Sequence, residues 1–105
     1  MNNLNDLKGK VCVITGGGGV IGGALATGLA TAGIITVILD INEEAAVKVA
    51  ESVKTETGTD SYGMKANVLD KASLAEVEQR IIKEVGEVDF LINGAGGNSP
   101  MATTQ

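Results

Sequence analysis

The stretch that decides the fold reads Val11-Cys12-Val13-Ile14-Thr15-Gly16-Gly17-Gly18-Gly19-Val20-Ile21-Gly22. Its first part is apolar and largely β-branched, which favours a strand buried on both faces. Four glycines follow, and the Ala- and Leu-rich segment from Val20 to Ala32 predicts a helix. Such a turn binds phosphate, because glycine lets the backbone approach an anion and the helix N-terminus offers unpaired N–H groups. The stretch therefore predicts a phosphate-binding turn.

Asp40 extends this prediction to a dinucleotide. Residues 17–22 satisfy the G-x-G-x-x-G pattern, although four glycines in a row make that match easy and a flexible linker is the alternative. Asp40 ends the next predicted strand, 18 positions after Gly22, where dinucleotide-binding folds place an acidic residue. Its carboxylate can accept both ribose hydroxyls of NAD and would repel the 2′-phosphate of NADP. Ile41 follows, where a site for that phosphate would favour Arg, so the predicted cofactor is NAD.

The composition limits the classes of protein to which the chain can belong. The 105 residues are 44% hydrophobic and only 2% aromatic, which indicates one small domain with an aliphatic core. The net charge of −5, without a cluster of Lys or Arg, argues against nucleic acid or an anionic membrane as a partner. Cys12 is the only cysteine and is expected in the core, and there is no histidine. A disulfide framework and a thiolate or histidine metal site are therefore excluded.

The uncharged run between Lys10 and Asp40 raises the question of a membrane span. Glycines interrupt the run, and a helix from Val20 to Ala32 would be about 20 Å long, short of the roughly 30 Å of a bilayer core. The first residues also lack the basic start and apolar centre of a secretory signal. We therefore expect no membrane partner and a cytoplasmic location.

The second half of the chain continues the alternation of strands and helices. Asn42 is the expected N-cap of a second helix, and a polar loop is expected over 55–60. The predicted inner face of that helix consists of Ala46, Val47, Ala50 and Val53. Further strands are predicted at 34–40, at about 61–66 and at 88–93.

A third helix has two competing start signals, Asp70 and a capping box of Ser73 with Glu76, and Gly86 ends it. Alternating strands and helices indicate right-handed βαβ units and a parallel sheet. The expected fold class is α/β, a partial Rossmann-type doubly wound sheet of strand order 3-2-1-4. Residues 1–105 are expected to form a single dinucleotide-binding domain.

Two separated motifs resemble those of the short-chain dehydrogenase/reductase family. The family shows T-G-x-x-x-G-[IL]-G after its first strand, as in residues 15–22, and N-N-A-G after its fourth, as in residues 93–96. The resemblance covers essentially the whole chain and implies an NAD site. The implied cofactor-binding residues are Gly16, Gly18, Gly19, Val20, Ile21, Gly22, Asp40, Ile41, Asn67, Val68, Asn93, Gly94, Ala95 and Gly96.

Three positions depart from the family pattern. Val20 stands where the family has its middle glycine, and Gly94 replaces the second Asn of N-N-A-G. Asn67-Val68 stands where the family usually has Asp-Val beside the adenine. Asn67 can still accept a hydrogen bond from an exocyclic amine through its side-chain oxygen.

The resemblance also implies the chemistry. Family members carry a catalytic Ser and a Tyr-x-x-x-Lys pair beyond strand four, and hydride passes between a substrate carbon and nicotinamide. Here Tyr62 is the only tyrosine and the residue four positions later is Ala66, so the chain holds no expected catalytic residue. It is predicted to be the N-terminal portion of an NAD-dependent oxidoreductase, without the catalytic half and inactive alone. A non-catalytic module that senses or sequesters NAD is the alternative.

Two expectations concern partners. The segment over 93–104 resembles a subgroup described as mannonate oxidoreductases or fructuronate reductases, which implies a sugar acid as the small-molecule substrate of the full-length protein. The strand at 88–93 would have an open, apolar outer edge, which is a template for another chain. We therefore expect a homo-oligomer or another association through that strand.

Overall fold

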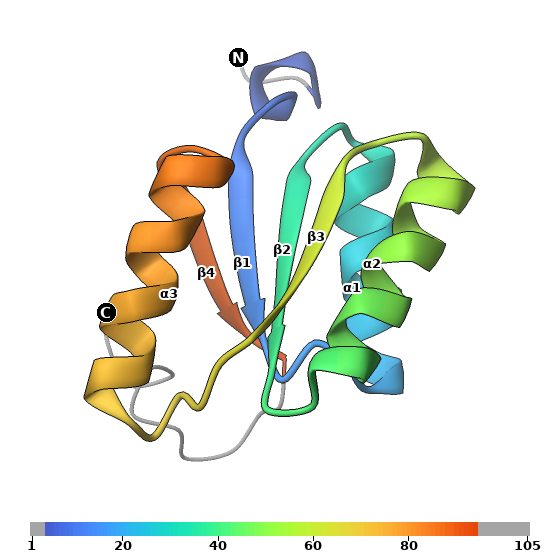
Figure 1. Cartoon of the computed structure of the whole chain (residues 1–105). Coiled ribbons are helices and arrows are strands. Elements are labelled where there is room, and N and C mark those ends of the chain that lie inside the picture. The colour runs from blue at the N-terminus through green and yellow to red at the C-terminus, as the bar shows by residue number, and fades with distance from the viewer. Residues whose placement is uncertain (1–3, 95–105) are drawn as a thin grey trace.

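In the computed structural model, which describes residues 4–94, a four-stranded sheet lies between helices on its two faces (Figure 1). The elements are η1 (Leu4–Leu7), β1 (Val11–Thr15), α1 (Val20–Thr31), β2 (Ile35–Asp40), α2 (Glu43–Thr57), β3 (Ser61–Lys65), α3 (Lys71–Glu84) and β4 (Phe90–Asn93). All strand pairs are parallel and the order is β3-β2-β1-β4, so the predicted Rossmann-type topology is confirmed.

The register of the strands brings their carboxyl ends together. Thr15, the last residue of β1, pairs with Leu39 of β2 on one side and with Asn93 of β4 on the other. Asp40 follows Leu39 and therefore extends one residue beyond the end of β1. Ligands of doubly wound sheets bind beyond this edge, so the chain presents three consecutive loops where a cofactor is expected.

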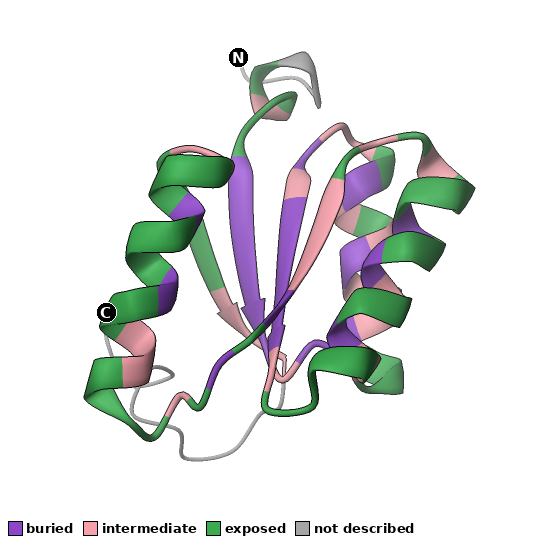
Figure 2. Cartoon of the chain, viewed as in Figure 1, coloured by how far each residue is buried: buried purple, intermediate pink, exposed green. Residues whose placement is uncertain are grey.

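The core has two halves, one on each face of the sheet. Helices α1 and α2 cover one face and α3 covers the other, and Figure 2 shows β1 buried along its whole length between them. The buried cluster under α1 and α2 consists of Cys12, Ile14, Ala26, Ala30, Ile34, Ile38, Ala46, Ala50 and Val53. The cluster under α3 consists of Val11, Val13, Val37, Leu39, Met64, Ala66, Val77 and Ile81.

The inner face of α2 differs from the prediction at Val47. Its side chain is 38% exposed, whereas Ala46 is fully buried. The cause lies on β3, where a Cβ at Gly63 would stand 2.5 Å from the Ala46 carbonyl carbon. Because Gly63 has no side chain, α2 packs its Ala46 side directly on the strand, and Val47, about 100° further round the helix, faces outward.

The C-terminal end of α2 corrects the prediction, and the start of α3 decides between the two predicted start signals. Helix α2 continues to Thr57, through the start of the expected loop, because Gly58 adopts a left-handed φ of 76° and its N–H binds the Lys54 carbonyl. Helix α3 begins after Asp70, whose side chain accepts from Ala72 and Ser73 N–H. Strand bounds differ by one or two residues: β2 begins at 35, β3 ends at 65 and β4 begins at 90.

Cys12 occupies the core position predicted for it. It is fully buried in β1, and burial raises the pKa of its thiol to about 11, so the neutral, unreactive form dominates near neutral pH. Within residues 4–94 no group of His, Cys, Asp or Glu could hold a metal ion. No helix in that part of the chain has the length and apolar character needed to cross a bilayer.

Candidate functional site

A groove of about 430 Å³ lies beyond the carboxyl ends of the strands. Its lining residues are Thr15, Gly16, Gly19, Leu39, Asp40, Ile41, Ala66, Asn67, Val68, Leu69 and Asn93. Seven of these are predicted site residues, brought together from four separate segments. Thr15, Leu39, Ala66 and Leu69 complete the lining without having been predicted. Ala95 and Gly96, which were predicted, lie outside the described residues.

The backbone of the glycine turn packs directly against the backbone of β2 and of the start of α1. Gly16 has a φ of +64°, a conformation that favours glycine, and Gly17 N–H donates to the Leu39 carbonyl at 3.1 Å. A Cβ at Gly22 would lie 2.5 Å from the Gly17 Cα atom. The start of α1 therefore rests directly on the turn, and a side chain at position 22 would separate them.

The N-terminus of α1 is open to a ligand. Its N-cap is Gly19, which has no side chain to accept from the first helical N–H groups. Val20, at the position of the family's middle glycine, is 91% exposed, so its side chain meets no obstacle within the described chain. The departure at Val20 is therefore compatible with the turn, and the helix end keeps donors for an anion.

Asp40 joins the turn to the end of β2. Its Oδ2 atom accepts from Gly18 N–H at 3.1 Å, and its Oδ1 atom accepts from Asn42 N–H at 2.9 Å. A Cβ at Gly18 would lie 2.7 Å from Oδ2, so this approach requires glycine. Each carboxylate oxygen can accept further hydrogen bonds, which leaves Asp40 able to bind hydroxyl groups in the groove.

Thr15 connects the turn region to β4. Its hydroxyl donates to the Asn93 side-chain oxygen at 3.1 Å, and Gly94 N–H donates to the Thr15 carbonyl at 2.7 Å. A Cβ at Gly94 would lie 2.9 Å from that same carbonyl oxygen, so the chain passes β1 closely where the family pattern has a second Asn. The two motifs predicted to act together are therefore in direct contact through one residue.

The segment after β3 forms the opposite wall. Asn67 Oδ1 accepts from Leu69 N–H at 3.0 Å, and Asn67 N–H donates to the Ser73 hydroxyl at 3.0 Å. The Ser73 hydroxyl therefore binds the backbone of Asn67, and Asp70 is the residue that caps α3. Leu69 is 75% exposed and Ile41 is 64% exposed, and both line the groove. Exposed apolar side chains on two segments suit a flat apolar ligand group.

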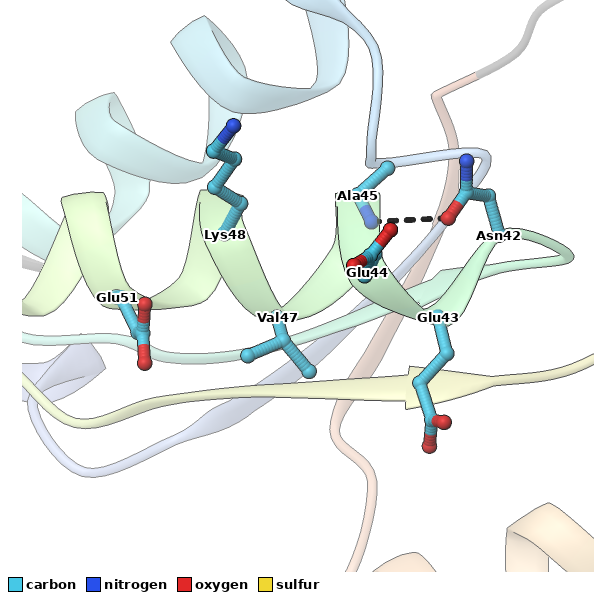
Figure 3. A pocket seen from close by; sticks show the side chains of 7 residues that line it. All are labelled: Asn42, Glu43, Glu44, Ala45, Val47, Lys48 and Glu51. Atoms are coloured by element: carbon cyan, nitrogen blue, oxygen red, sulfur yellow. Dashed lines mark hydrogen bonds between the residues drawn. The ribbon is translucent and has the colours of Figure 1, made fainter.

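A second, larger hollow of about 590 Å³ lies on α2 (Figure 3). Its lining residues are Asn42, Glu43, Glu44, Ala45, Val47, Lys48 and Glu51. Figure 3 shows Lys48 and Glu51 pointing to opposite sides of the helix, and Asn42 is engaged as the N-cap through Ala45 N–H. The side chains do not converge and three of them are acidic, so this surface does not suit a phosphate ligand.

Comparisons with known proteins show the family to which the chain is similar. A family model described as short chain dehydrogenase matches residues 10–105. A protein of Haemophilus influenzae named "Uncharacterized oxidoreductase" is 43% identical over 100 residues, covering 95% of this chain and 35% of that protein. The 7alpha-hydroxysteroid dehydrogenase of Escherichia coli is 35% identical over 94 residues, covering 90% of this chain and 36% of that protein.

A solved structure shows the same fold. The NAD-bound crystal structure of a proposed D-mannonate oxidoreductase from Haemophilus influenza is 43% identical with a TM-score of 0.80. The match covers 94% of this chain and 35% of that one. The chain thus spans about a third of the length of the relatives it matches.

Proposed function

This chain belongs to the short-chain dehydrogenase family, and from that membership we propose that it is the NAD-binding part of an oxidoreductase. The observation that carries the proposal is the Asp40 carboxylate, bonded to the glycine turn and lining the groove. An acidic residue at this place accepts ribose hydroxyls, and the adjacent helix end takes the pyrophosphate. We propose that residues 1–105 act as one dinucleotide-binding domain.

Each part of the groove suits one part of NAD. The turn over 16–22 has the close backbone packing and open helix end that a pyrophosphate needs. Asp40 would hold the adenosine ribose, and the apolar walls at Ile41 and Val68 would hold the adenine. Asn93 lies on the other side of β1 from Asp40 and would face the nicotinamide end of the dinucleotide. When bound, the nicotinamide ring accepts or donates hydride.

The proposal is tested by titrating the chain with NAD while recording amide NMR shifts. We expect saturable shifts at Gly17, Gly18 and Asp40 and around Asn67, because these backbones line or support the groove. The C-terminal part of α2, at Glu51 to Thr57, serves as the internal control because it lies away from the glycine turn. Shifts confined to that helix, or no saturable shift at all, would contradict the proposed function.

The sugar-acid substrate implied by the sequence is also a proposal. It is supported by the relative described as a D-mannonate oxidoreductase, at 43% identity, although the steroid dehydrogenase at 35% shows how widely substrates vary among relatives. We propose that a full-length enzyme containing this sequence transfers hydride between nicotinamide and the hydroxyl or carbonyl group of a sugar acid. The absence both of NAD reduction with D-mannonate and related sugar acids and of NADH oxidation with the corresponding keto acids would contradict this assignment.

The 105-residue chain alone is expected to catalyse no NAD-dependent oxidation. The only tyrosine, Tyr62, lies on β3 and packs against the core under α3, and Ala66 stands four residues later, so the chain has no Tyr-x-x-x-Lys pair. Absorbance at 340 nm, followed with sugar acids and alcohols as substrates, should stay at the buffer level. Turnover that persists after removal of contaminating host enzymes would contradict this prediction.

The exposed side of β4 supports the proposed self-association. Within residues 4–94, β4 pairs with β1 alone, and Figure 2 shows the first half of the strand exposed and the second half intermediate. Phe90 and Leu91 are exposed on the strand, and Val88 lies exposed just before it. An apolar strand edge can pair with the same edge of a second copy, and a stable interface would bury about 800 Å² per copy.

We expect the chain to sediment as a dimer or larger species at micromolar concentration. Val88→Lys should shift it toward the monomer, because a charge would be desolvated beside β4. Val47→Lys on α2 is the matched control, since the two valines are 39% and 38% exposed, and it should leave the sedimentation coefficient unchanged. A stable monomer of the unmutated chain would contradict the proposed interface.

A further inference from the structure

Strand β4 forms one edge of the sheet in the part of the chain that the structure describes (Figure 1). Gly94 N–H, directly after the strand, donates to the Thr15 carbonyl of β1 at 2.7 Å. Backbone N–H and carbonyl groups of successive strand residues point to alternate sides, so Phe90 and Ile92 also direct theirs to β1. Leu91 therefore directs its N–H and carbonyl group to the outer edge, where a further strand can pair.

The side chains of β4 divide between the two faces of the sheet. Ile92 packs against the cluster under α1 and α2, and Phe90, two positions earlier, lies on the same face. Leu91 lies on the other face, level with Val13 of the cluster under α3. Phe90 is 41% exposed and Leu91 is 46% exposed, so residues 4–94 leave apolar surface uncovered on both faces of the strand.

An apolar cleft of about 140 Å³ lies between α3 and the face of the sheet that carries Leu91. Apart from Glu78, its lining residues are apolar. Val77 and Ile81 line it from α3 and are buried, whereas Val88 and Leu91 line it from the β4 side and are exposed. The cleft is therefore open toward β4. Apolar cavities of roughly 150 Å³ hold a molecule the size of benzene, so the cleft has room for a leucine side chain.

We propose that this surface binds a second copy of the chain, with the two β4 strands antiparallel about a two-fold axis at Leu91. The proposal rests on the self-association proposed above and specifies its geometry. In a symmetric antiparallel pair the residue on the axis faces its own copy, and opposed side chains share one face of the sheet. The two Leu91 residues then exchange backbone hydrogen bonds, and each side chain covers the open side of the other copy's cleft.

The sequence of β4 selects this axis among the neighbouring ones. With the axis at Leu91, Phe90 lies opposite Ile92 of the second copy, so every opposed pair over 90–92 is apolar. An axis at Phe90 would place Leu91 opposite the charged Asp89. An axis at Ile92 would place Leu91 opposite Asn93. Either shift sets apolar surface against a polar side chain and desolvates it, which the axis at Leu91 avoids.

Disulfide formation tests the position of the axis. Leu91→Cys should form a covalent dimer on mild oxidation, because the Cα atoms of a hydrogen-bonded antiparallel pair lie about 5.5 Å apart, within the range of a disulfide. Ile92→Cys should form about tenfold less, because its counterpart lies two positions away along the strands, roughly 7 Å further. Non-reducing electrophoresis and intact mass measure the product. Cys12 is fully buried, so the unmutated chain should not cross-link.

Ile82→Cys is the matched control for random collision. Ile82 lies on α3, is 52% exposed against 46% for Leu91, and does not line the cleft. This variant should give no more covalent dimer than Ile92→Cys. Thermal melts followed by circular dichroism check that each variant keeps its fold.

A charge exchange at the same position needs no oxidation. Leu91→Lys and Leu91→Glu each place like charges opposite one another at the axis, so either chain alone should sediment as a monomer. An equimolar mixture of the two should sediment as a dimer, because opposite charges then meet. Ile82→Lys and Ile82→Glu are the controls and should remain dimeric, both alone and mixed.

The outcomes separate this geometry from the self-association on which it rests. If the unmutated chain is a dimer, but Leu91→Cys cross-links no faster than Ile82→Cys and mixing does not restore the dimer, the axis is wrong and the self-association stands. Equal cross-linking of Ile92→Cys and Leu91→Cys would also overturn the axis. If the unmutated chain is a monomer, the self-association and this geometry both fail, and the cleft has another occupant.

Discussion

Asp40→Ala is expected to weaken NAD binding by about ten- to a hundredfold and to remove most of the discrimination against NADP. A hydrogen bond to a charged group contributes about 1.5–3 kcal/mol, which corresponds to this range. The loss has two sources, because the carboxylate both faces the groove and holds Gly18 N–H in the turn. Its negative charge also repels a 2′-phosphate, so NADP should lose less affinity than NAD.

Calorimetric titration of each variant with both dinucleotides measures this effect. Asp60→Ala is the control for the change in net charge, since Asp60 pairs with Lys54 on the surface away from the groove. It should leave the ratio of the NAD and NADP constants unchanged. Equal affinity of the unmutated chain for the two cofactors would contradict the role of Asp40.

Two glycine-to-alanine changes in α1 are expected to have opposite effects on stability. Gly22→Ala should lower the free energy of unfolding by about 3 kcal/mol, because its Cβ would stand 2.5 Å from the backbone of Gly17. It should also cost most of the NAD affinity, since the helix must move away from the turn. Gly28→Ala should raise stability by about 0.5–1 kcal/mol, because nothing lies within 4 Å of its Cβ and alanine favours the helix.

Urea denaturation followed by far-ultraviolet circular dichroism suits this comparison, since the chain has no tryptophan. Both variants replace glycine by alanine in α1. The contribution of helix propensity to the free energy of unfolding is therefore the same in both and cancels in their difference. A Gly22→Ala variant as stable as Gly28→Ala would show that the turn does not pack on α1 as described.

The elements around the glycine turn could be predicted because their signals are local. The apolar run of β1, the glycines and the spacing to Asp40 each lie within one βαβ unit. The alternation of strands and helices then fixed the parallel order through the right-handed crossover. None of these inferences depends on which side chains meet across the sheet.

The errors arose where a distant contact decides between local alternatives. Val47 and Ala46 fit the same apolar pattern, and only Gly63 on β3 determines which of them faces the sheet. The two start signals of α3 could not be separated by sequence either, and Asp70 caps the helix while the Ser73 hydroxyl accepts from Asn67 N–H. Leu69 was missed because an exposed leucine in a polar turn carries no signal until the groove is known.

The position of β4 in the sheet has a consequence for how the chain folds. About 25 residues separate paired positions of β1 and β2, and of β2 and β3, whereas 78 residues separate those of β1 and β4. Loop-closure entropy rises with that separation, so we expect the β1–β4 pairing to form after the other two. During synthesis the Asp40 side of the groove can assemble once β3 has emerged, whereas Asn93 joins it only after β4 docks. We infer that the two sides of the groove form at different times, with the Asp40 side first.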